Sequence, residues 1–97
     1  MTKIIIKENY INEYDVELFK YNNLFEELIK KYDYEVILKI TWYIIRHIAG
    51  NKFLDEDGNV IENKFGYFKT SMLNNINKII NSEIEWNEEI GWFEENV

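Results

Sequence analysis

The stretch Tyr34–Ala49, YEVILKITWYIIRHIA, decides the fold of this 97-residue chain. Its apolar side chains point in almost every direction around a helix, and a helix of that kind is usually the buried centre of a fold. Asp33 is a suitable N-cap for this helix, and Gly50 is a suitable residue to end it. The sequence therefore predicts a central helix on which the rest of the chain packs.

Two further helices are predicted, one before and one after the central helix in the sequence. An apolar face with the three- and four-residue spacing of a helix runs from Glu13 to Tyr32, and Asn12 is its expected N-cap. A second apolar stripe runs from Lys64 to Asn81 after the expected cap Asn63. The apolar residues are Leu18, Tyr21, Phe25, Leu28 and Tyr32 in the first helix and Phe65, Phe68, Met72, Leu73, Ile76, Ile79 and Ile80 in the second.

Three shorter elements complete the predicted fold. Lys3–Lys7 is expected to be a short extended piece, either an edge strand or a tail packed on the helices. An Asp-Gly pair lies between short apolar stretches and predicts a small two-stranded hairpin, or at least a tight loop, over Asn51–Glu62. Ser82 and Glu85 have the spacing of a capping box, so a short fourth helix is expected there. The expected fold class is mostly α, with three main helices, a short C-terminal helix and a small β-hairpin between the second and third helices.

The composition indicates one globular domain over residues 1–97. Apolar residues make up 46% of the chain and aromatic residues 16%, which is enough for a hydrophobic core. The chain has no cysteine, which excludes disulfides, thiolate metal sites and a cysteine nucleophile. No apolar run approaches the length of a membrane span and no secretory signal opens the chain, so we expect a cytoplasmic protein.

The sequence offers little that indicates catalysis or a bound metal. The acidic run Asp55–Asn59 does not fit a calcium-binding EF-hand loop, because its glycine is in the fourth position instead of the sixth. His47 is the only histidine, so it is expected to be a packed or half-exposed side chain and not a zinc ligand or a general base. The C-terminal glutamates have the pattern of a solvated face. We therefore expect no catalytic residue, no metal ligand and no cofactor, and a protein that binds instead of an enzyme.

Charge is unevenly placed and points to two candidate binding surfaces. The net charge is −7, yet residues 63–82 contain lysines as their only charged residues, whereas residues 83–97 contain six glutamates and no basic residue. The polar side of the third helix suits phosphates or base edges, although an asparagine-rich composition alone also accounts for it. Its candidate nucleic-acid contacts are Lys64, Lys69, Asn74, Asn75 and Lys78.

Residues 83–97 form an acidic and aromatic tail, and this tail is the second candidate surface. A combination of aromatic and acidic side chains suits the docking of a basic partner. The alternative, that this segment closes the core, stays open at this point. The candidate partner contacts are Trp86, Glu88, Glu89, Trp92, Glu94 and Glu95.

Part of the chain, residues 33–80, resembles a known family. The shared features are a helix with Tyr43-Ile44, a following loop, and a helix start of the form I-x-N-x-x-G-Y-F. The residues that match this helix start are Ile61, Asn63, Gly66, Tyr67 and Phe68. This segment resembles the C-terminal helical domains of DnaD-like and plasmid or phage replication-initiator proteins from low-GC Gram-positive bacteria. The resemblance implies an accessory role in replication or plasmid maintenance through contacts with proteins and with DNA. The chain departs from the family pattern in its acidic tail and in lacking a winged-helix module, and both departures argue against direct DNA binding.

Two hypotheses for the function follow from these features. The first is a non-enzymatic adaptor of a mobile element or replication system, which contacts DNA or a DNA-bound protein. The second is a small acidic inhibitor, like phage-encoded anti-defence proteins, whose tail imitates nucleic-acid charge and blocks a basic nucleic-acid-binding enzyme. In both hypotheses the expected partner is a basic, nucleic-acid-associated protein. DNA itself is a further candidate partner, and a membrane is not.

Overall fold

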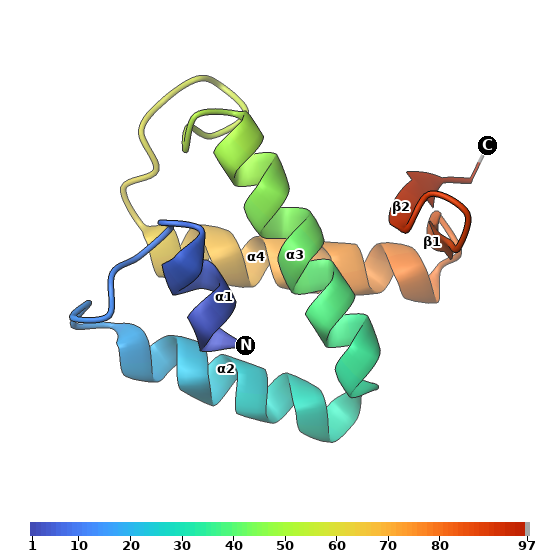
Figure 1. The fold of residues 1–97 in the computed structure, drawn as a ribbon, viewed down its shortest axis with the longest axis horizontal. Coiled ribbons are helices and arrows are strands. Elements are labelled where there is room, and N and C mark those ends of the chain that lie inside the picture. The colour runs from blue at the N-terminus through green and yellow to red at the C-terminus, as the bar shows by residue number, and fades with distance from the viewer. Residues whose placement is uncertain (97) are drawn as a thin grey trace.

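A computed structural model describes residues 1–96, which fold into four helices followed by one β-hairpin (Figure 1). Helices make up 56% of the chain. The elements in order are α1 (Thr2–Lys7), α2 (Leu18–Lys31), α3 (Tyr34–Gly50), α4 (Lys64–Ile80), β1 (Ile84–Asn87) and β2 (Trp92–Glu95). In Figure 1, α3 crosses α4, while α1 contacts both α2 and α3 and the hairpin lies beyond the end of α4.

The central helix α3 lies where its apolar pattern predicts it. The Asp33 side chain caps it by accepting a hydrogen bond from the backbone N–H of Glu35 at 2.8 Å. Thr41 is fully buried, and its hydroxyl donates a hydrogen bond to the carbonyl of Ile37 at 2.8 Å. This bond gives the buried hydroxyl a partner within the same helix. The other buried residues of α3 are Ile37, Ile40, Ile44, Ile45 and Ile48. One side of α3 therefore forms the centre of the core and leaves the opposite side for other contacts.

An aromatic cluster joins α2, α4 and the segment after α1. Phe68 is fully buried on α4, and its ring centroid lies 6.1 Å from that of Tyr10, 5.7 Å from that of Tyr21 and 5.7 Å from that of Phe25. The Tyr10 hydroxyl donates to the carbonyl of Lys64, and the Lys64 ammonium donates to the carbonyl of Tyr10 at 3.0 Å. These contacts fix the N-terminal segment to the start of α4.

The structure corrects the predicted position of the β-hairpin, because residues 51–63 form a loop and not a pair of strands. The expected tight turn is present. Gly58 has a φ of +80°, and the Asp55 carboxylate accepts hydrogen bonds from the backbone N–H groups of Asp57 and Asn59. The flanking residues make only one isolated bridge, between Leu54 and Val60. Val60 is 72% exposed, so no apolar face is available there to hold a sheet together.

The predicted C-terminal helix is also wrong, because β1 and β2 form an antiparallel hairpin in its place. Ser82 does not cap a helix. Its φ of +58° places it in the left-handed region, where it turns the chain out of α4. Gly91, with a φ of +65°, supports the turn between the strands. Ile84 on β1 and Phe93 on β2 are buried, so contact with the helices favours a hairpin over a local helix.

Two corrections apply near the N-terminus. Residues 3–7 are helical and not extended, because α1 packs on α2 and α3 with Ile5 fully buried. The next helix begins at Leu18 and not at Glu13. The Asn12 side chain accepts a hydrogen bond from the N–H of Tyr14, so it stabilises a turn in the loop instead of capping a helix.

Candidate nucleic-acid interface

The outward side of α3 carries alternating cationic and aromatic side chains. Lys39, Trp42, Tyr43 and Arg46 are three or four residues apart, so they lie along one side of the helix. The Arg46 guanidinium lies 5.1 Å from the centroid of the Trp42 ring, a cation–π distance. Because the opposite side of α3 is buried in the core, these side chains are held on a rigid element.

The C-terminal hairpin adds its own aromatic rings to this side of α3. The Trp92 ring lies 5.3 Å from the Tyr43 ring and 5.8 Å from the Arg46 guanidinium. The Trp86 ring lies 4.5 Å from the Lys39 ammonium. Phe93 links the two, with its ring 5.4 Å from Tyr43 and 5.1 Å from Trp86. We call this set the aromatic–cation cluster: Lys39, Trp42, Tyr43, Arg46, His47, Trp86, Trp92 and Phe93.

The cations of this cluster face aromatic rings and not carboxylates. Within residues 1–96 the two ion pairs are Lys20–Glu17 and Lys30–Glu26, both on α2 or at its start. Arg46 is exposed and takes part in neither. A guanidinium beside a ring keeps its N–H edge available for an anion, and the fork of N–H donors fits both carboxylate and phosphate groups.

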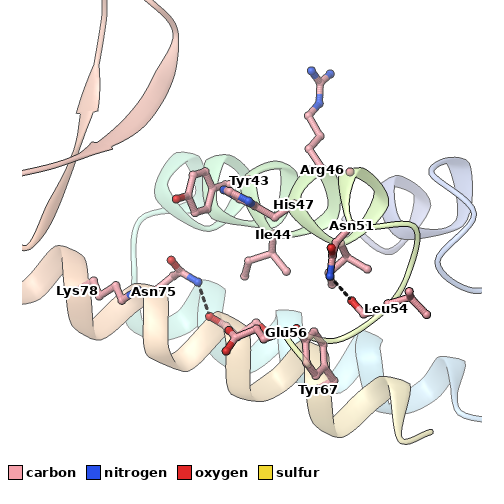
Figure 2. Close-up of a pocket in the computed structure, with 13 residues that line it drawn as sticks. Tyr43, Ile44, Arg46, His47, Asn51, Leu54, Glu56, Tyr67, Asn75 and Lys78 are labelled. Carbon is pink, nitrogen blue, oxygen red and sulfur yellow. Dashed lines mark hydrogen bonds between the residues drawn. The ribbon is translucent and has the colours of Figure 1, made fainter. Parts of the chain in front are cut away.

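An open groove of about 560 Å³ lies between the C-terminal half of α3 and α4, beside the aromatic–cation cluster. Figure 2 shows Asn75 and Lys78 on the α4 side and Tyr43 and His47 on the α3 side. Arg46 points away from α4 in this view and so lies at the rim. The groove therefore combines hydrogen-bonding side chains with a cluster that supplies cations and ring faces.

Two cations and one carboxylate line this groove, although the chain as a whole is acidic. Arg46 and Lys78 carry positive charges there, and Glu56 from the 51–63 loop is the single carboxylate among its lining residues. Burial raises the pKa of Tyr67, and the nearby carboxylates of Glu56 and Asp55 raise it further. Burial likewise raises the pKa of Tyr43, with a smaller contribution from Glu95. Both tyrosines are thus neutral hydrogen-bonding groups at physiological pH.

The structure separates the five residues predicted as one polar face of α4. It brings together Asn75, whose amide donates to the carbonyl of Ser71 at 2.8 Å, and Lys78 in the groove. Lys64 is held by its bond to the Tyr10 carbonyl. Lys69 lies on the other flank of α4, in a depression shared with α2, and Asn74 is exposed at the surface. A single face made of all five residues is therefore not what the fold provides.

The acidic and aromatic tail is divided between the core and the solvent. Trp86 and Trp92 are half-buried and contact α3 and its cations, so they help to close the core. Glu88 and Glu89 are exposed in the turn between the strands, and Glu94 and Glu95 are exposed on β2. Val97, the last residue of the predicted tail, lies outside the described residues.

The sequence analysis missed the residues of α3 that form the candidate interface. Their signal was present as the spacing of Lys39, Trp42, Tyr43 and Arg46, which places two cations and two aromatic rings on one side of a helix. The apolar character of the whole segment obscured it, because the rings were counted as core. The contact with Trp92 joins residues far apart in the chain, so no local pattern indicates it.

His47 is exposed and lies against Tyr43, with the ring centroids 4.4 Å apart. No group of three or more histidine, aspartate or glutamate side chains with metal-binding geometry occurs in residues 1–96. In the same residues, no helix has the length and apolar character that crossing a bilayer requires.

Comparisons with known proteins give no relative for this chain. No family model matches it, and no similar curated protein or similar solved structure was found.

Proposed function

We propose that this protein is a non-enzymatic binding protein that contacts nucleic acid through the aromatic–cation cluster and the adjoining groove between α3 and α4. The observation that carries the proposal is the position of the Arg46 guanidinium within cation–π distance of two indole rings, 5.1 Å from the centroid of Trp42 and 5.8 Å from that of Trp92. Lys78 and Asn75 extend the polar contacts into the groove.

The chemistry of the cluster favours single-stranded nucleic acid. Proteins that bind single strands combine positive charge along the backbone path with aromatic rings on which unpaired bases stack. Trp42, Tyr43 and Trp92 are half-buried, so each ring is held in place and is still partly accessible. In a duplex the bases are already stacked on one another, and their faces are not available to these rings.

The net charge of −7 does not oppose a local site of this kind. Exposed charges farther apart than about 8 Å are largely screened at physiological ionic strength. Carboxylates that lie beyond this distance from Arg46 therefore have little effect there. The overall charge instead suppresses nonspecific binding to phosphate backbones.

The resemblance of residues 33–80 to replication-initiator domains supplies the setting that we propose for this binding. An adaptor of a replication system or mobile element meets single-stranded DNA wherever a duplex is opened. The same setting includes DNA-bound proteins, which are the expected protein partners.

The direct test is fluorescence anisotropy with a labelled single-stranded DNA of about 15 nucleotides, a length within the range that such sites occupy. We expect Arg46→Ala to weaken binding by at least tenfold, because one hydrogen bond to a charged group contributes about 1.5–3 kcal/mol. We also expect the slope of log affinity against log salt to fall by about 0.7 for each phosphate that the variant no longer neutralises. Lys78→Ala is expected to act in the same direction.

Lys69→Ala is the matched control, because it removes the same charge from the opposite flank of α4. Intrinsic fluorescence gives an independent signal, since bases stacked on the indoles should quench them. If Lys69→Ala weakens binding as much as Arg46→Ala does, or if the wild-type protein binds no oligonucleotide at low salt, the proposed site is wrong.

A second candidate function is supported by the hairpin, because six exposed carboxylates lie on or beside this short, ordered element. This arrangement suits the acidic inhibitor, which would occupy the groove of a basic nucleic-acid-binding enzyme. The test is inhibition of a purified cationic nuclease, compared with a variant in which Glu88, Glu89, Glu94 and Glu95 are changed to Gln. Equal inhibition by both proteins would exclude this candidate.

A further inference from the structure

Two carboxylates, those of Glu85 and Glu94, lie on the same face of the hairpin as the Trp92 ring. Side chains two residues apart on a strand share a face, so Glu94 lies on the same face of β2 as Trp92. The strand register places Glu85 directly opposite Glu94 and Asn87 directly opposite Trp92. The Asn87 amide donates to the Glu94 carboxylate at 2.7 Å and so fixes its position.

Stability does not explain this arrangement. Like charges directly opposite each other on paired strands destabilise a sheet. The ion pairs within residues 1–96 involve neither carboxylate. Both side chains are exposed, so they act on whatever approaches Trp92 from solvent.

We infer that Glu85 and Glu94 make the proposed site selective for single strands by repelling the second backbone of a duplex. This inference rests on the proposed function. A flexible single strand places its bases on Trp92 and its phosphates toward Arg46 and Lys78, and so keeps its backbone away from the hairpin. A duplex is stiff and carries one negative charge for about every 1.7 Å of its axis on two backbones, so it cannot follow that path.

The cations and the carboxylates thus flank the same ring from two elements. Arg46 on α3 attracts the backbone beside Trp92, and the Glu85–Glu94 pair, on the same face of the hairpin as Trp92, repels it. The other residues on this face of the hairpin are Asn87, whose amide donates to Glu94, and Trp92. The pair therefore sets strand selectivity, while Arg46 sets affinity.

The test compares the affinities of wild-type protein and the double variant Glu85→Gln and Glu94→Gln for one sequence as a single strand and as a duplex. Glutamine keeps the size and hydrogen-bonding capacity of each side chain and removes the charge. We expect the affinity for the duplex to rise by roughly tenfold, a size typical of local electrostatic effects on association. We expect the affinity for the single strand to change by less than about threefold.

A variant with Glu13→Gln and Glu27→Gln is the matched control, because it changes the net charge equally at exposed sites on the loop before α2 and on α2. Circular dichroism verifies that all three proteins are folded. The inference would be overturned if the double variant gained equal affinity for both forms of DNA, or gained no affinity for the duplex. It would also be overturned if the control variant gained as much affinity for the duplex. Each of these results would leave the single-strand site intact. Failure of the wild-type and the double variant to bind either form would overturn the proposed function and this inference with it.

Discussion

Replacing Phe93 with alanine tests whether the C-terminal hairpin is part of the cooperative core. The Phe93 side chain is only 7% exposed, and its ring lies against Tyr43 of α3 and Trp86 of β1. Removing a buried phenylalanine side chain costs about 3–5 kcal/mol of unfolding free energy. Because Phe93 lies at the edge of the core, where neighbours can move into the space, we expect about 3 kcal/mol.

The measurement is urea unfolding followed by far-ultraviolet circular dichroism and by tryptophan fluorescence. With a slope of about 1.5 kcal/mol per molar urea, typical of a small protein, the midpoint should fall by about 2 M. Both signals should shift together, because Trp86 packs against Phe93 and Trp92 packs against Tyr43, which Phe93 also contacts.

Ile90→Ala is the control for this experiment. Ile90 is 62% exposed in the turn of the same hairpin, so its removal should change stability by no more than about 0.5 kcal/mol. The reasoning is refuted if Phe93→Ala lowers the free energy of unfolding no more than Ile90→Ala does. It is also refuted if Phe93→Ala changes the fluorescence without moving the circular dichroism midpoint. In either case the hairpin is not part of the cooperative core.

Three further predictions concern pH and the helix starts. Burial raises the pKa of Tyr10 and Tyr21 in the folded protein above the value of a free tyrosine. The two side chains therefore contribute their full stabilisation below pH 10, and this stabilisation is lost as the pH rises further. A urea midpoint that stays constant well above pH 10 would contradict this prediction. Asp33→Ala should lower the free energy of unfolding by about 1 kcal/mol, because α3 loses its cap. Asp33→Asn should keep most of the stabilisation by the cap, and thermal unfolding can measure both effects. Gly66→Ala should be nearly neutral, because helix propensity gains about 1 kcal/mol but the added Cβ would lie 2.6 Å from the Asn63 amide that caps α4. In a protein that already carries Asn63→Ala, Gly66→Ala should stabilise by about 1 kcal/mol, because the clash is gone. If Gly66→Ala changes stability equally with and without Asn63, the proposed clash with Asn63 is wrong.

Local sequence patterns were sufficient to predict where α3 and α4 begin, because each helix has a capping residue directly before its apolar residues. Asp33 and Asn63 both accept the expected backbone hydrogen bonds, and the two helices begin at the residues that follow them. A cap is a local contact between residues two or three positions apart, so the sequence carries the whole signal.

The hairpin could not be placed in the same way because its stabilising contacts are distant in sequence. Ser82 and Glu85 satisfy the rule for a capping box, yet the burial of Ile84 and Phe93 against the helices is decided by tertiary packing. The turn at Gly58 was identified correctly, but a turn alone does not form strands where the flanking residues remain exposed. The candidate site depends on the hairpin, since Trp92 reaches Arg46 only through this packing.

The two-stranded sheet has a consequence for the behaviour of the protein in solution. Within residues 1–96 neither strand has a second neighbour, so each presents one row of backbone groups able to pair with another molecule. At neutral pH the crowded glutamates keep such rows apart, since two approaching copies repel each other. Added salt screens this repulsion without covering the strand edges. The C-terminal hairpin is therefore where self-association should begin, and buffers of low ionic strength should favour storage at high concentration.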